Sequence, residues 1–232
     1  MTTSWTVILE GDFSPHPWVD PGIGLATVLT SRASAVGLDP YTRTSSNGAA
    51  VVADGDRRAW VVSEAWLRTG SGTFCTLTVD VENDAGSLVL ACSILVDALE
   101  RLGVATIDAA TFSRHDAEHL RDIWTAPDSL WSELADPSDA TPALLRVSAG
   151  DGSRSSRDEA WADVSSGVPW LAGSEWQDVG AQDRRAAGPE AATEMRVVLP
   201  EWSLTVLALL ADLVSVAWPT SALRVSRDGM TR

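Results

Sequence analysis

The sequence predicts a soluble α+β protein, because three stretches of the chain repeat a short strand followed by a helix. Of the 232 residues, 45% are hydrophobic and 21% are charged, which is typical of a globular chain with its own core. We expect an antiparallel or mixed sheet with helices packed on one face.

The first strand-helix stretch begins where Trp5, Val7 and Leu9 alternate with polar residues. A bend that carries two prolines follows. Asp20 then predicts the N-cap of a helix over residues 21–36, and Gly37 its end.

The second stretch has the clearest periodicity. Leu77, Val79 and Val81 alternate with polar residues and predict a half-buried strand. A helix over 85–102 is predicted next from apolar residues at steps of four and three: Leu88, Cys92, Leu95, Leu99 and Leu102. Gly103 ends this helix, and residues 104–112 predict a returning strand.

The third stretch contains a strand through Met195, Val197 and Leu199 and a helix over 203–217. This helix is apolar nearly all round, with Asp212 its only charge. A membrane span needs about 20 apolar residues, so the shorter helix is interpreted as buried in the core. Residues 222–226 predict the closing strand.

Two further strands, 49–53 and 60–68, are predicted to form a hairpin through Asp54-Gly55-Asp56. The order of elements in residues 1–113 resembles the ferredoxin-like βαββαβ arrangement with an extra hairpin. The second half repeats this order loosely, starting with a strand over 143–149.

These elements divide the chain into three predicted parts. Residues 1–118 form a ferredoxin-like α+β domain, and 119–141 form an acidic, Trp-containing connector. Residues 142–232 form a second α+β half, with a long polar loop over 150–193 and the buried helix over 203–217.

The charge of the chain limits its partners. All 17 basic residues are arginine, and the net charge is −15. A surface this negative repels phosphate backbones and anionic lipids, so we expect no nucleic-acid or membrane binding. A basic protein partner is favoured instead.

Cys75 and Cys92 have no CxxC spacing, and no signal peptide is predicted, which together indicate a cytoplasmic protein.

One string resembles a catalytic motif. His115-Asp116-Ala117-Glu118-His119 matches the H-x-x-E-H signature of inverted zinc peptidases, in which the two histidines bind zinc and the glutamate activates water. The resemblance covers five residues and nothing marks a third ligand. A solvated helix start, with two acids near the positive end of the dipole, explains the same residues. We therefore predict no catalytic residues, metal or cofactor.

The tryptophans fall into two predicted groups. Those in strands and in the core helix are expected to be buried. The second group lies in polar, loop-rich sequence: Trp124, Trp131, Trp161, Trp170 and Trp176. Such rings are either exposed and contact a partner, or packed on the core, where they hold a long loop in place.

The segment from Asp122 to Thr141 combines acidic residues with apolar anchors and has no arginine. Such a segment suits docking to a basic protein, since charges steer association and aromatic anchors slow dissociation. A plain interdomain linker explains it equally well. The predicted binding residues are Trp124, Asp128, Trp131, Glu133, Asp136 and Asp139.

Three functional hypotheses follow from the sequence. The first is a non-enzymatic protein-binding module, such as an immunity or antitoxin-like inhibitor of a basic protein. The second is a self-assembling structural or scaffold protein, which would form a homo-oligomer. The third is a zinc-dependent hydrolase that uses His115, Glu118 and His119.

Overall fold

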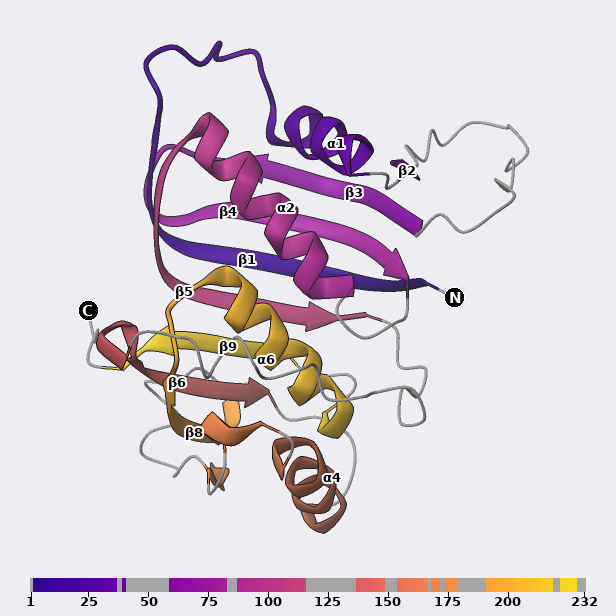
Figure 1. The fold of residues 1–232 in the computed structure, drawn as a ribbon, viewed down its shortest axis with the longest axis vertical. Coiled ribbons are helices and arrows are strands. Elements are labelled where there is room, and N and C mark those ends of the chain that lie inside the picture. Colours follow the sequence, from indigo (N-terminus) through magenta and orange to yellow (C-terminus); the bar gives the residue numbers. More distant parts are fainter. Residues whose placement is uncertain are drawn as a thin grey trace.

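The computed structural model describes residues 2–36, 39–40, 59–82, 87–115, 137–148, 154–166, 168–171, 174–178, 191–218 and 222–228. These residues form α-helices and a largely antiparallel sheet, so the predicted α+β class is confirmed (Figure 1). The described strands make one nine-stranded sheet with the order β2-β3-β4-β1-β5-β9-β6-β8-β7. Among the described strand pairs, only the short β2–β3 pair is parallel.

The first half of the chain supplies five of these strands and two helices. Its elements are β1 (Thr2–Pro15), α1 (Leu25–Ala35), β2 (Asp39–Pro40), β3 (Ala59–Leu67), β4 (Gly70–Glu82), α2 (Ser87–Leu102) and β5 (Gly103–Arg114). Within the sheet its strands run in the order β2-β3-β4-β1-β5.

The second half supplies the remaining strands. Its elements are η1 (Pro137–Asp139), β6 (Thr141–Ser148), α4 (Arg154–Ser166), η2 (Pro169–Leu171), β7 (Gln177–Asp178), β8 (Ala191–Leu199), α6 (Leu204–Ala217) and β9 (Ala222–Arg227). The two halves meet where β5 pairs with β9, with Thr111 opposite Arg224.

The helices form a row in the order α1, α2, α6 and α4, with each helix packed against the next (Figure 1). Alternate strand residues are buried in one core with these helices, as Val7, Leu77 and Val225 show with 0% exposure. The intervening residues, such as Thr6 and Thr78, keep intermediate exposure, as expected for the other face of an antiparallel sheet. None of the described helices is long and apolar enough to cross a membrane.

The three predicted helices are present at nearly their predicted positions, but the start of the first was wrong. Helix α1 begins at Leu25, after Gly24, and no side chain caps it. Asp20 instead closes a turn, because its Oδ1 accepts a hydrogen bond from the Gly22 amide at 2.8 Å and its carbonyl accepts one from Ile23 at 2.9 Å. Aspartate favours such local turns as readily as helix caps.

The predicted long loop over 150–193 was also wrong in part. This stretch contains α4, η2 and β7, and β8 begins at Ala191. A few apolar side chains inside the polar sequence order it, since Trp161, Leu171 and Trp176 are all buried. The predicted strand 49–53 and the hairpin turn at 54–56 lie outside the described residues. The predicted strand 60–68 is β3, and it forms a hairpin with β4.

Candidate binding surface

The structure describes one of the six predicted binding residues. Asp139 is exposed at the end of η1, and its carbonyl accepts a hydrogen bond from Thr141 Oγ1 at 3.0 Å. The others lie outside the described residues: Trp124, Asp128, Trp131, Glu133 and Asp136. Docking through this acidic segment therefore stays a prediction.

The zinc motif is described only at its first residue. The His115 amide donates to the Ser4 carbonyl at 3.0 Å, and its Nε2 lies 2.8 Å from Thr6 Oγ1. These contacts tie the end of β5 to β1. Glu118 and His119 lie outside the described residues. In the described ranges, no three histidine, cysteine, aspartate or glutamate side chains group as metal ligands.

Two tryptophans for which a partner contact was considered are buried instead. Trp161 of α4 is 4% exposed and Trp176 before β7 is 7% exposed. Both pack on Trp218 at the end of α6, with ring centroids 6.2 and 4.8 Å from it. For these two rings the alternative, pinning loop sequence onto the core, is correct. Trp170 is half-buried.

A different tryptophan is exposed. Trp18 lies in the connection between β1 and α1, and 75% of its surface is accessible. No other large hydrophobic residue of the described chain is as exposed; Val104, at 63%, comes next. One face of the indole stacks on the His16 imidazole, with centroids 4.4 Å apart and planes 12° apart. Most of the indole surface is therefore solvent-accessible.

The connection that carries Trp18 is fixed to the helix layer. The His16 amide donates to the Leu102 carbonyl at 3.0 Å, and His16 Nε2 donates to the Glu100 carbonyl at 3.1 Å. Both acceptors lie in the last turn of α2. The Val19 amide donates back to His16 at 3.1 Å. In Figure 1 this connection is the indigo segment that passes over the top of the view to α1.

The arginines with described side chains have partners within the chain. Five form ion pairs with carboxylates: Arg32 and Arg101 with Asp97, Arg146 with Glu194, Arg196 with Asp228, and Arg224 with Glu10. Two more stack on indoles, Arg68 on Trp66 and Arg227 on Trp202. Arg114 is buried and also has an interaction.

The pair between Glu10 and Arg224 crosses the junction of the two halves, because Glu10 lies on β1 and Arg224 on β9, on either side of β5. Both terminal guanidinium nitrogens, Nη1 and Nη2, donate to the carboxylate, the second of them at 2.8 Å. The hydrogen bond from Arg224 holds the pKa of the Glu10 carboxyl below its usual value, against the opposing effect of burial.

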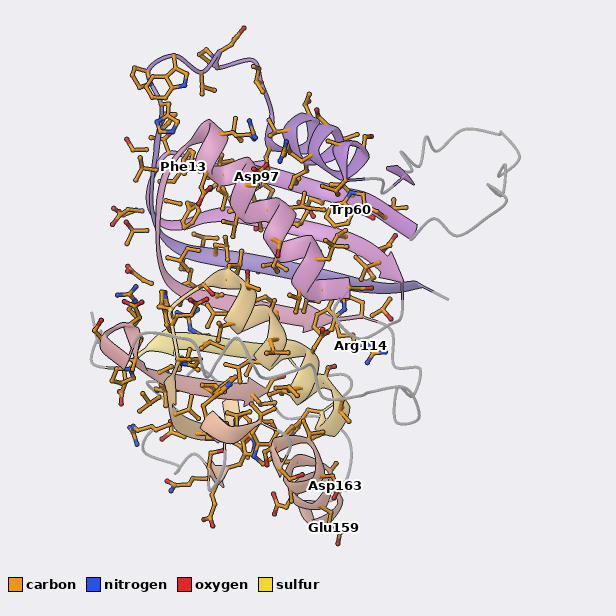
Figure 2. All side chains as sticks on the ribbon, viewed as in Figure 1. Phe13, Trp60, Asp97, Arg114, Glu159 and Asp163 are labelled. Carbon is orange, nitrogen blue, oxygen red and sulfur yellow. The ribbon has the colours of Figure 1, made fainter. Side chains whose placement is uncertain are left out.

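Many carboxylates, by contrast, are exposed without an ion pair among the described residues. Glu159 and Asp163 project from α4 in Figure 2. Others of this kind include Asp20, Glu64, Glu100, Asp139 and Glu175. The described part of the surface therefore carries carboxylates that no described cation pairs with.

The two cysteines are buried inside the core and free of disulfides. Burial raises the pKa of the Cys75 thiol to about 12 and that of Cys92 still higher. Both thiols are thus protonated at neutral pH and inaccessible, which is the opposite of a reactive nucleophile.

A shallow polar hollow of about 290 Å³ lies beside β7 and β8. Its lining residues are Ser174, Glu175, Gln177, Glu194, Met195 and Arg196. Glu194 is 3.6 Å from Arg146 and Arg196 is 3.4 Å from Asp228, so these two charges have partners, whereas Glu175 is exposed. The described lining residues form no arrangement of acid, base and nucleophile.

Sequence reasoning did not single out Trp18. A signal was present, because the ring follows His16 in a proline-flanked bend outside any hydrophobic periodicity. Comparison with protein-family models and with curated proteins finds no match to this chain, so the binding surface is assigned from its own geometry alone.

Proposed function

We propose that this chain is a non-enzymatic protein-binding module for a basic protein partner, in the manner of an immunity or antitoxin-like inhibitor. One observation carries the proposal: the arginines with described side chains are engaged within the chain, whereas several exposed carboxylates have no ion pair among the described residues. Such a surface gains most from a partner that supplies the missing positive charge.

Electrostatics rank this partner above other classes. With a net charge of −15, the chain repels nucleic acids, anionic lipids and further copies of itself. A basic protein is attracted over distances near the Debye length, about 8 Å at physiological salt. We expect this attraction to raise the association rate and to weaken as salt is added.

We also infer that each half is a ferredoxin-like unit, loosely duplicated along the chain. The first half gives the order β3-β4-β1-β5 and the second gives β7-β8-β6-β9, so corresponding strands occupy corresponding places. In this arrangement the helices cover one face of the sheet, and the fold serves as a scaffold for surface contacts rather than for a buried site.

A self-assembling scaffold is the second candidate. The observation that favours it is the edge of the sheet at β8, where, within the part of the chain that the structure describes, β7 pairs only with Thr193 and Glu194, and Val198 is 57% exposed. Open strand edges can pair with another copy. Light scattering of the pure protein at micromolar concentration separates the candidates, since a scaffold forms a defined oligomer by itself.

The experiment for the first candidate starts with affinity capture from the soluble fraction of the native host. The captured protein is then purified, and its association rate with the chain is measured at 50 and 300 mM salt. We expect a protein with net positive charge whose association slows several-fold at the higher salt. Capture of an acidic protein contradicts the proposal, and so does an association rate that is the same at both salt concentrations.

A further inference from the structure

We propose that Trp18 is the anchor of the docking surface and that the partner presents an apolar pocket rimmed by basic side chains. The Trp18 surface is defined here as Trp18, Asp20, Ile23 and Glu100. This inference rests on the proposed function and specifies where the basic partner docks.

The exposure of Trp18 is the first argument. An indole carries one of the largest apolar surfaces of any side chain, and tryptophan is enriched among the residues that dominate binding energy. Most indoles described in this chain are buried or half-buried, whereas Trp18 is 75% exposed. Ile23, in the same connection, is 47% exposed and adds apolar area next to the turn at Asp20.

Preorganisation is the second argument. The stack on His16 restricts the indole to one orientation, and the two bonds from His16 to α2 restrict the backbone on which it stands. The turn closed by Asp20 restricts the chain on the far side. A side chain ordered before binding loses less conformational entropy when the partner arrives.

The charges around Trp18 identify the partner. Asp20 and Glu100 are exposed carboxylates without an ion pair among the described residues. Asp20 lies two residues after Trp18 in the same connection, and the Glu100 carbonyl in α2 accepts a hydrogen bond from His16. The adjacent Arg101 is paired with Asp97 at 3.1 Å. An apolar anchor on a connection that carries or contacts two exposed acidic residues therefore suits a pocket bordered by arginine or lysine, and it disfavours both a second copy and an anionic membrane.

The test begins with a photocrosslinker. Trp18 is replaced by p-benzoylphenylalanine in the full-length chain, and the soluble proteins of the native host serve as the probe. The matched control carries the same group in place of Trp66, a half-buried indole on β3. We expect one strong crosslink to a basic protein from position 18, weakened at 300 mM salt, and none to this protein from position 66.

A competition experiment then measures how much the Trp18 side chain contributes to binding. Unlabelled wild-type chain should abolish the crosslink, Trp18→Ala should compete at least tenfold less well, and Trp66→Ala should compete as wild type. Trp18→Phe, which keeps an aromatic ring, should fall between them. Circular dichroism of each variant shows that the fold is intact.

Each contrary outcome has a separate meaning. If wild type competes and Trp18→Ala competes equally, the Trp18 surface is wrong while the proposed function stands. If no basic protein is crosslinked or captured by the wild-type chain, the proposed function fails as well. A crosslink from position 18 to a second copy overturns the inference in favour of self-association. Co-sedimentation of the wild-type chain with phosphatidylcholine vesicles, if Trp18→Ala abolishes it, overturns the inference in favour of lipid contact.

Discussion

The contrast between two tryptophans gives the sharpest test of the fold. Trp218→Ala removes an indole that is 2% exposed and that contacts Trp161 and Trp176. Replacing a buried aromatic ring with alanine costs about 3–5 kcal/mol. The two ring neighbours place Trp218 toward the upper end, because aromatic pairs add about 0.5–1.5 kcal/mol beyond area burial.

Trp18→Ala is the same chemical change at an exposed position and serves as the matched control. Surface substitutions usually alter stability by less than about 0.5 kcal/mol. The measurement is urea unfolding followed by far-UV circular dichroism, with near-UV spectra as a record of the Trp161–Trp176–Trp218 cluster. We expect the free energies of unfolding of the two variants to differ by about 3 kcal/mol or more, with Trp218→Ala the less stable.

A loss below about 1 kcal/mol for Trp218→Ala would show that α4 and α6 do not share the packed cluster described above. A loss above about 2 kcal/mol for Trp18→Ala would show that its indole is part of the core rather than a surface anchor. Either result would refute the assignment of the two rings.

Three further predictions concern single groups. Because Arg224 lowers the pKa of Glu10, this pair stabilises the fold above the unfolded carboxyl pKa of 4.5 and loses its effect as pH falls through the lowered folded value. In urea unfolding, Glu10→Gln should therefore be less stable than wild type at pH 7 and nearly equal to it at pH 2. The same stability difference at both pH values would contradict this prediction. The thiols of Cys75 and Cys92 should react with Ellman's reagent at pH 8 only after unfolding in urea, since both are buried; rapid reaction of the native protein would refute their placement. Elemental analysis should find no stoichiometric zinc, and one zinc per chain that is lost in His115→Ala would instead put the hydrolase hypothesis first.

Local periodicity predicted the strands and helices that bury one apolar face in the core. In β4 and α2 the apolar spacing matches the strand and helix repeats, and residues at those positions, such as Val79 and Leu95, are fully buried. Helix α4 was missed because its mean composition is polar, although Trp161 and Val164 are enough to hold one side of it against α6. The pairing of β5 with β9 was also beyond local reasoning, since it joins residues more than 100 positions apart in the sequence.

The candidate surface was less accessible to sequence reasoning than the fold. Whether an indole in polar sequence is exposed depends on its tertiary contacts, so for Trp161 and Trp176 sequence reasoning left a partner contact and a loop-pinning role both open. A basic partner stays a prediction, which follows from the net charge of −15 alone. Among the described residues, the pairing of the arginines leaves several exposed carboxylates without an ion pair.

The measurement that tests the central proposal most directly is the binding kinetics of the captured basic protein with wild type, Trp18→Ala and Trp66→Ala at 50 and 300 mM salt. We predict that Trp18→Ala leaves the association rate nearly unchanged and raises the dissociation rate enough to cost about 2 kcal/mol or more, as expected of a central anchor. Higher salt should slow association equally for all three chains. Dissociation of Trp18→Ala at the wild-type rate, together with association that is independent of salt, would contradict an acidic docking surface anchored by Trp18.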